Sequence, residues 1–142
     1  MAGVSAATNA PPPPCAAGFS PITNQAGGAV AGTGVNNPVN LQSTGNCFKA
    51  ENPTSTPDGT GYEYVNGDGH CLWVNANTLE VGANDCANGH PNEVIVGTSH
   101  TGAGWTLLSE ANMELLQPNV CGSIGTKVTT QIDLGPCARW TV

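Results

Sequence analysis

The sequence predicts an all-β fold: a disulfide-stapled antiparallel sandwich or barrel-like domain, preceded by an extended Pro/Gly-rich N-terminal arm. Short apolar runs that alternate with polar residues recur along the chain between turn residues, which is typical of β-rich domains. The six cysteines are an even number and fit a disulfide framework. Apolar residues make up only 39% of the 142 residues, so we expect covalent links to support a small core.

The N-terminal arm is expected over residues 1–38, which are dominated by Ala, Gly, Pro, Asn and Thr. Pro11 to Pro14 favour a stiff polyproline II segment. The Gly-rich run 25–34 has too few large apolar residues to form a core of its own. We therefore expect one β-rich domain over residues 39–142, and an arm that contacts protein subunits of a larger assembly.

The strongest hairpin signal lies in residues 61–86. The apolar runs 62–65 and 72–74 flank Asn66-Gly67-Asp68-Gly69, residues that tolerate the positive φ angles of tight turns. A third run, 79–81, follows further turn residues, and Cys71 and Cys86 bracket the pair. This pattern predicts a hairpin held by one disulfide.

Other strands are predicted by short apolar or alternating runs at 39–41, 47–48, 93–96, 105–108, 128–134 and 139–142. Residues 109–116 are interpreted as one or two helical turns that Ser109 caps and that end before Pro118. A strand ending at Leu116 is the alternative for this segment.

The cysteine spacing suggests that Cys71 pairs with Cys86 and Cys121 with Cys137, which leaves Cys15 for Cys47. Sequence alone does not choose among the possible pairings. No Cys-x-x-Cys occurs, and the three histidines have no zinc-site spacing to the cysteines, so neither a metal nor a cofactor is expected. Disulfides predict an oxidising location, extracellular or in a virion.

The first fourteen residues, MAGVSAATNAPPPP, lack the basic and apolar regions of a secretory signal. Two explanations are open: a signal has been replaced by Met1, or the protein leaves the cell without a signal. The second explanation fits a particle that assembles inside a cell, is released by lysis and is oxidised afterwards.

The charge balance excludes two classes of partner. Two lysines and one arginine stand against ten acidic residues, which gives a net charge of −7. A protein that binds nucleic acid must neutralise several phosphates with Lys or Arg, and attraction to anionic membranes needs the same cations. We therefore expect no nucleic-acid partner and no membrane partner.

Residues 61–142 resemble the ricin-B or R-type lectin family. The resemblance rests on Cys71-Leu72-Trp73-Val74 through Cys86, and on Cys121 through Cys137 followed by Trp140. The repeats of that family place a disulfide around a short strand pair within a β-trefoil. The resemblance therefore implies a β-trefoil as the alternative fold and glycans as possible ligands.

This chain departs from that family at the sugar site and at the end of each repeat. The family uses an Asp shortly after the first cysteine, where this chain has Trp73 or Asn75. The family's Gln-x-Trp motif is replaced by the segments 90–93 (HPNE) and 138–140 (ARW). Only two disulfide units of this kind are visible, whereas a trefoil has three lobes.

Aromatic residues are the best candidates for a contact surface, because their faces match the apolar faces of pyranose rings. Tyr62 and Tyr64 share one strand face and are the preferred surface candidates, with Trp73 as a further possible glycan or partner contact. At least two of the three tryptophans, Trp73, Trp105 and Trp140, are expected in the core.

The sequence predicts no enzyme. His70 lies beside Cys71, but that cysteine is expected in a disulfide, and no Gly-x-Ser-x-Gly motif occurs. The composition is similar to that of actinobacteriophage virion accessory proteins, so the main expectation is a non-enzymatic structural protein of an extracellular particle, such as a capsid decoration protein. The alternative is a secreted carbohydrate-binding module of the R-type lectin style.

Overall fold

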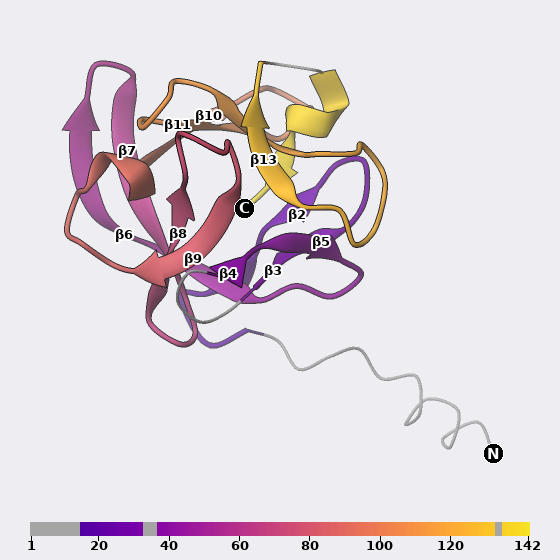
Figure 1. Ribbon diagram of the computed structural model, residues 1–142, viewed down its shortest axis with the longest axis horizontal. Helices are drawn as coiled ribbons and strands as arrows, with labels where there is room; N and C mark the ends of the chain where they lie inside the picture. Colours follow the sequence, from indigo (N-terminus) through magenta and orange to yellow (C-terminus); the bar gives the residue numbers. More distant parts are fainter. Residues whose placement is uncertain (1–14, 33–36, 133–134) are drawn as a thin grey trace.

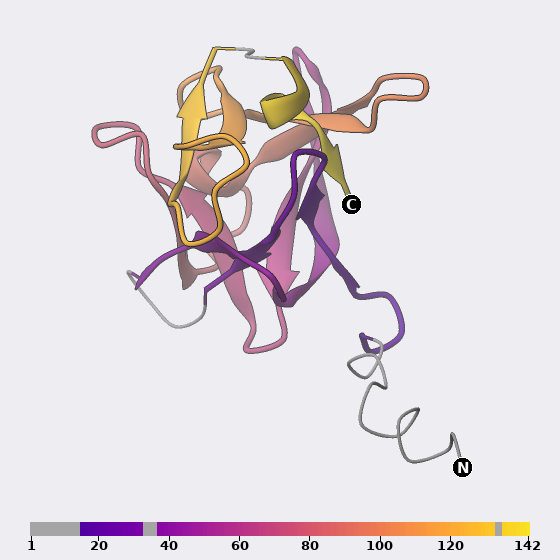
Figure 2. The same ribbon diagram turned by 90° about the vertical axis from the view of Figure 1, so that its right-hand side faces the viewer.

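The computed structural model describes residues 15–32, 37–132 and 135–142. Within these ranges the chain forms short strands, turns and two 3-10 segments, and the strands curl around one interior (Figures 1 and 2). Every strand pair is antiparallel. The all-β, antiparallel fold class is therefore confirmed.

The elements follow one another in the order β1 (Ser20–Pro21), β2 (Thr23–Asn24), β3 (Ala29–Ala31), β4 (Asn37–Pro38), β5 (Asn40–Gln42), β6 (Cys47–Thr56), β7 (Gly59–Asn66), β8 (His70–Val74), β9 (Val81–Asp85), η1 (Pro91–Glu93), β10 (Ile95–Ser99), β11 (Trp105–Ser109), β12 (Leu115–Pro118), β13 (Val128–Gln131), η2 (Gly135–Ala138) and β14 (Trp140–Thr141). The turn expected between β7 and β8 is present, because the Asn66 side chain accepts hydrogen bonds from the Asp68 and His70 amides at 2.9 and 3.1 Å.

The strands form three successive groups of four. β1 and β2 lie on either side of Ile22, and we count them as one interrupted strand. β4 and β5 lie on either side of Val39 and are also counted as one strand. The groups are then β1 to β6, β7 to β10, and β11 to β14, which we call lobes 1, 2 and 3.

The sheet closes on itself. Its path runs from β4 through β9, β8, β7, β10, β11, β14, β2 and β3 to β5. The two ends of this path, β4 and β5, are consecutive in the chain, with only Val39 between them. The Val39 amide donates to the Val81 carbonyl at 3.0 Å, and the Val128 amide donates to the Val39 carbonyl at 3.1 Å. One segment of lobe 1 therefore joins lobes 2 and 3 into a ring.

The core is a single cluster to which all three lobes contribute. Trp140 is its largest fully buried side chain, and its indole N–H donates to the Leu116 carbonyl at 2.8 Å. This hydrogen bond matters because an unpaired indole N–H in an apolar interior costs free energy. The other members are Ile22, Val30, Val39, Leu41, Phe48, Tyr64, Leu72, Val74, Val81, Ile95, Leu107, Leu116 and Val128.

Three disulfides join the pairs that the spacing suggested, and each belongs to one lobe: Cys15–Cys47, Cys71–Cys86 and Cys121–Cys137. The first pair supplies the third disulfide unit, which was not visible as a repeat in the sequence. Three disulfides in one domain indicate an oxidising, extracellular environment. In the described part of the chain, no helix has the length and apolar character needed to cross a bilayer.

The prediction of an arm over residues 1–38 is wrong for its described strands. Val30 pairs with Leu41, and both Ile22 and Val30 are buried in the core. Small residues permit this packing: a Cβ atom added to Gly45 would lie 2.7 Å from the Cβ of Ala29. This segment has few large apolar residues because its backbone packs closely against neighbouring strands, where only small side chains fit. Residues 1–14 and 33–36 of the expected arm lie outside the described residues.

The helical interpretation of residues 109–116 is also wrong. β11 ends at Ser109, and a tight turn leads into β12 at Leu115. The Ser109 amide donates to the Glu114 carbonyl at 2.9 Å, and its hydroxyl accepts from the Ala111 amide at 3.2 Å. Met113 has a φ of 60°, which a continuing helix does not allow. The Ser109 hydroxyl therefore stabilises a hairpin turn where a helix cap was expected.

Candidate functional site

The outward face of the β8–β9 hairpin presents polar and aromatic groups. Trp73 lies directly opposite Gly82, and Cys71 lies opposite Asn84. Side chains alternate along a strand, and the neighbouring positions 72, 74, 81 and 83 are buried in the core. Trp73 and Asn84 consequently face away from the core, on the side of the hairpin that the core does not fill.

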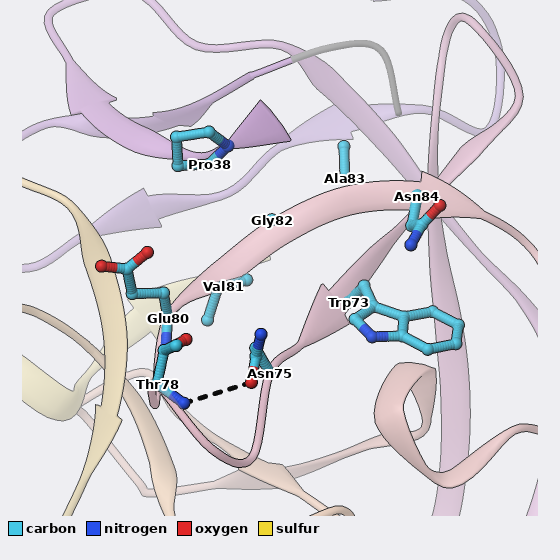
Figure 3. Close-up of a pocket in the computed structure, with 9 residues that line it drawn as sticks. All are labelled: Pro38, Trp73, Asn75, Thr78, Glu80, Val81, Gly82, Ala83 and Asn84. Carbon is cyan, nitrogen blue, oxygen red and sulfur yellow. Dashed lines mark hydrogen bonds between the residues drawn. The ribbon is translucent and has the colours of Figure 1, made fainter. Parts of the chain in front are cut away.

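An open cavity of about 260 Å³ lies on this face (Figure 3). Because Gly82 has no side chain, the position opposite the Trp73 indole stays unfilled. The residues that line the cavity are Pro38, Trp73, Asn75, Thr78, Glu80, Val81, Gly82, Ala83 and Asn84.

The turn between β8 and β9 forms one wall of the cavity. The side-chain oxygen of Asn75 accepts hydrogen bonds from the Asn77 and Thr78 amides at 2.9 and 3.1 Å. Leu79 adopts a φ of 66°, and its amide donates to the Asn75 carbonyl at 2.7 Å. Figure 3 shows the Asn75 amide nitrogen directed away from this turn. The turn therefore fixes a hydrogen-bond donor at the edge of the cavity.

One ion pair sets the electrostatics at the end of this turn, where the Asn75 amide donates to the Glu80 carbonyl at 2.9 Å. The Lys127 ammonium lies 2.9 Å from the Glu80 carboxylate and donates a hydrogen bond to it. Glu80 belongs to lobe 2, whereas Lys127 directly precedes β13 of lobe 3. Glu80 is the acidic residue of the lining, and this pair balances its charge.

The orientation of Trp73 depends on the segment that follows β9. The His90 ring stacks on the indole, with centroids 4.7 Å apart and planes at 29°. The His90 Nδ1 accepts a hydrogen bond from the Asn92 amide at 3.2 Å. The Asn92 side chain in turn donates to the Val74 carbonyl at 2.7 Å. Residues 90–92 therefore attach to β8 and hold the imidazole against the indole.

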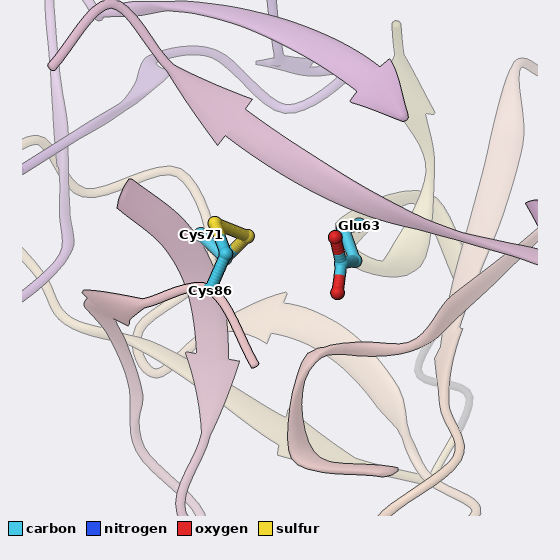
Figure 4. A group of neighbouring side chains, drawn as sticks. All are labelled: Glu63, Cys71 and Cys86. Carbon is cyan, nitrogen blue, oxygen red and sulfur yellow. A yellow bond between two sulfur atoms is a disulfide. The ribbon is translucent and has the colours of Figure 1, made fainter. Parts of the chain in front are cut away.

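Glu63 lies beside the disulfide of the same lobe (Figure 4). One carboxylate oxygen of Glu63 and the sulfurs of Cys71 and Cys86 lie within 4.8 Å of one another. The two sulfurs are bonded to each other, so neither is a thiolate that could bind a metal. This group is therefore part of the lobe's framework, and we assign it no metal.

The predicted aromatic contacts are only partly on the surface. Trp73 reaches the cavity, as described above. Tyr64 is only 7% exposed and belongs to the core, so the prediction that it is a surface residue is wrong. Tyr62 is half-buried, packs against the core and pairs with Ile95. A chain with few large apolar residues uses its tyrosines as core material.

The prediction that at least two tryptophans lie in the core is wrong as well. Trp140 is buried, Trp73 is half-buried at the cavity, and Trp105 is 38% exposed. Trp105 covers Gly97 on the neighbouring strand, where an added Cβ would lie 3.3 Å from its ring. It therefore packs along the outside of the sheet.

Of the residues that line the cavity, only Trp73 was predicted as a site residue; Asn84 and the stacked His90 illustrate what was missed. Asn84 could have been found from alternation, because Gly82 and Asn84 alternate with the apolar residues Val81 and Ala83 along β9. His90 gave no such signal. It meets Trp73 only through the path of the chain after β9.

No protein-family model and no curated protein sequence matches this chain. Solved structures match it in fold. One is a chain of the cytolethal distending toxin of Haemophilus ducreyi, with a TM-score of 0.74 and 15% identity over 94% of this chain and 88% of that chain.

Two further matches carry names that describe a fold or a ligand. The BEL β-trefoil has a TM-score of 0.69 and 14% identity, covering 92% of this chain and 95% of that chain. SeviL, in a structure bound to asialo-GM1 saccharide, has a TM-score of 0.66 and 14% identity, covering 87% and 94%. At these identities the likeness shows the fold alone. The three-lobed ring of this chain is a β-trefoil, the alternative that the lectin resemblance implied.

Proposed function

We propose that this protein is a secreted carbohydrate-binding module of the R-type lectin style, and that it binds glycans in the cavity beside Trp73. The observation that carries the proposal is the pairing of Trp73 with Gly82, which leaves an indole beside an unfilled space. A sugar ring has one apolar face and a rim of hydroxyl groups. An aromatic surface flanked by amides matches both parts of such a ring.

The polar groups around the indole fit hydroxyl groups better than charged ligands. Asn75, Thr78 and Asn84 line the cavity and provide neutral donors and acceptors. The Glu80 charge is balanced by Lys127 at 2.9 Å. The volume of about 260 Å³ is close to the lower end of ligand pockets, about 300 Å³, and suits a short, neutral glycan epitope.

Binding rather than catalysis is part of this proposal. Glycoside hydrolysis generally needs two carboxyl groups that face each other across the scissile bond. Among the described residues that line the cavity, Glu80 is the carboxylate, and it is held in an ion pair. Similarity of fold to a structure bound to asialo-GM1 saccharide supports the ligand class but not a particular sugar.

The role of an accessory protein in a phage virion remains a sequence-based prediction. That prediction included an N-terminal arm that contacts neighbouring subunits of the assembly. Residues 20–32 and 37–38 of that segment contribute to the ring, and residues 1–14 lie outside the described chain. The site on lobe 2 favours the glycan-binding alternative, and that alternative is our proposal.

A glycan array followed by calorimetry with a positive glycan tests the proposal. We expect Trp73→Ala to weaken binding at least about tenfold, about 1.4 kcal/mol, because it removes the aromatic surface. Trp105→Ala is the matched control: it removes an exposed tryptophan outside the cavity and should leave affinity unchanged. No saturable binding by the wild type, or equal losses in both variants, would disprove the proposed site.

A further inference from the structure

Two carboxyl groups are buried together beneath the segment that holds His90. Glu63 of β7 is 4% exposed, and Glu93 of η1 is fully buried. They accept hydrogen bonds from two amides only two residues apart, those of Ala87 and Gly89, so the two carboxyl groups lie close together. Two ionised carboxylates held this close in a buried site repel each other, which favours a proton on one of the two.

This carboxyl pair holds the backbone of residues 86–90, the site loop. The Ala87 amide donates to both oxygens of Glu93, at 2.8 and 3.0 Å, and the Gly89 amide donates to Glu63 at 2.9 Å. Asn88 and Gly89 adopt left-handed conformations with φ of 45° and 82°. These conformations let the Ala87 and Gly89 amides both point toward the carboxyl groups. The site loop is therefore shaped around the pair.

The site loop connects the carboxyl pair to the candidate glycan site. The loop begins at Cys86, which the disulfide fixes to β8, and ends at His90, which stacks on Trp73 at 4.7 Å. The Glu93 amide also donates to the His90 carbonyl at 2.9 Å. A change in the position of the carboxyl groups can therefore shift the site loop and, through His90, the contact with the Trp73 indole.

The environment of the pair separates its two titrations. Burial, together with the Glu63 hydrogen bond and charge, raises the pKa of Glu93 to about 7. Burial also opposes ionisation of Glu63, but hydrogen bonds with Glu93, the Gly89 amide and Asn52 outweigh that effect and lower the pKa of Glu63. Glu93 is therefore the group that holds the proton at weakly acidic pH.

The other titratable groups near the pair are more exposed. The Lys49 and Glu51 side chains on β6 are 44% and 46% exposed and pair with each other at 3.4 Å. His70 on β8 pairs with the exposed Asp85 at 3.6 Å. On the side of η1 and β11, Glu110 faces Asp58, and the His90 Nδ1 accepts a hydrogen bond from the Asn92 amide. None of these groups is among the charged partners of Glu63 or Glu93.

We propose that Glu63 and Glu93 are positioning residues whose shared proton keeps the site loop, and with it His90, in the geometry that supports Trp73. Loss of the proton places two negative charges side by side in a buried site, and their repulsion loosens the loop. Glycan affinity then falls as the pH rises through neutrality. This inference rests on the proposed function for its effect on glycans, but its effect on the loop stands independently.

The first test follows the wild-type protein alone by NMR between pH 5 and 9. One buried glutamate carboxyl signal should titrate near pH 7. Over the same range, hydrogen exchange of the Ala87 and Gly89 amides, corrected for intrinsic rates, should accelerate by up to about tenfold per pH unit, the limit for release of one proton. If both carboxyl groups titrate below pH 5.5, or if the corrected exchange rates stay constant, the inference is wrong.

The second test measures the pH profile of glycan affinity in variants. Glu93→Gln cannot ionise, so its affinity should not change between pH 6 and 8.5, whereas the wild-type affinity declines. Glu51→Gln is the matched control, because it removes an exposed carboxylate directly opposite Glu63 and should keep the wild-type profile. Identical profiles for Glu93→Gln and the wild type would overturn the inference.

The two proposals fail in different ways. If no glycan binds at any pH but the amide exchange still responds near pH 7, the proposed function is wrong and the proton-linked loop stands. If a glycan binds with a pH-independent affinity and the loop does not respond, the glycan site stands and the proton link is wrong. Should Glu93→Gln not fold, the wild-type NMR titration still decides.

Discussion

Lobes 2 and 3 build similar disulfide-linked hairpins, but only one of them leaves a cavity beside an aromatic ring. The two hairpins can be aligned by placing Val81, the first residue of β9, on Val128, the first residue of β13. In this alignment the cross-strand pair Trp73–Gly82 of lobe 2 corresponds to the pair Gln117–Thr129 of lobe 3. Gln117 is fully buried, and its amide donates to the Ile132 carbonyl. Lobe 3 therefore fills the position that lobe 2 leaves open.

The comparison shows which part of the hairpin carries the fold and which part carries the candidate function. The inward positions of both hairpins are buried and belong to the ring. The outward positions do not determine the fold, so they can differ between lobes. A large aromatic residue opposite glycine produces an open surface, whereas glutamine opposite threonine produces a closed one. The candidate binding site thus depends on a few outward-facing residues that can change without changing the fold.

The largest contrast is expected between two tryptophans. Trp140→Ala should destabilise the protein by about 3–5 kcal/mol, because it removes the largest buried side chain and leaves the Leu116 carbonyl without its donor. Trp73→Ala should cost about 1 kcal/mol or less and act mainly on glycan affinity. Urea denaturation of both variants measures the difference. Similar losses of stability would mean that Trp73 is a core residue.

The two disulfides should contribute equally to stability and differently to the site. Cys71–Cys86 and Cys121–Cys137 close loops with sequence separations of 15 and 16, so replacing either pair with serines should cost about 3 kcal/mol. Only the first replacement frees the beginning of the site loop, so it should also weaken glycan binding. Thermal melts and calorimetry test this, and an unchanged melting temperature would contradict the structural role of the bridge.

The smallest change exchanges single residues between the lobes. Gly82→Thr introduces into lobe 2 the residue that lobe 3 carries at that position, and it should weaken glycan binding about tenfold by filling the cavity while the fold persists. The reciprocal Thr129→Gly should cost about 1 kcal/mol of stability, because glycine weakens a strand. Circular dichroism and calorimetry distinguish these outcomes. Undiminished affinity in Gly82→Thr would remove Gly82 from the site.

Much of the fold could be predicted from local patterns. Alternation identified β8 and β13, and the Asx-Gly residues identified the turn after Asn66, because these features depend only on neighbouring residues. The cysteine spacing suggested the three disulfide pairs that the structure contains, without excluding other pairings. The N-terminal strands escaped prediction, since Ala and Gly pack there through close backbone approach rather than through large side chains.

Less of the candidate site could be predicted. Trp73 was recognisable from its position in the lectin-like stretch, but the partners of its ring were not. Glu63 and Glu93 are far apart in the sequence and come together only because η1 packs against β7. No local sequence pattern therefore predicts this pair. Tyr64 was misassigned because alternation shows that two residues share a face without showing which face is buried.

The joining of three lobes through Val39 also has a consequence for the order of events in folding. Val39 lies early in the chain, yet its two backbone partners are Val81 and Val128. The ring cannot close until the third lobe has been synthesised and β13 has formed. Contacts between residues so distant in sequence form slowly. We therefore expect slow folding of this domain, with the β2 edge of lobe 1, which pairs with β14, unpaired until the last third of the chain arrives.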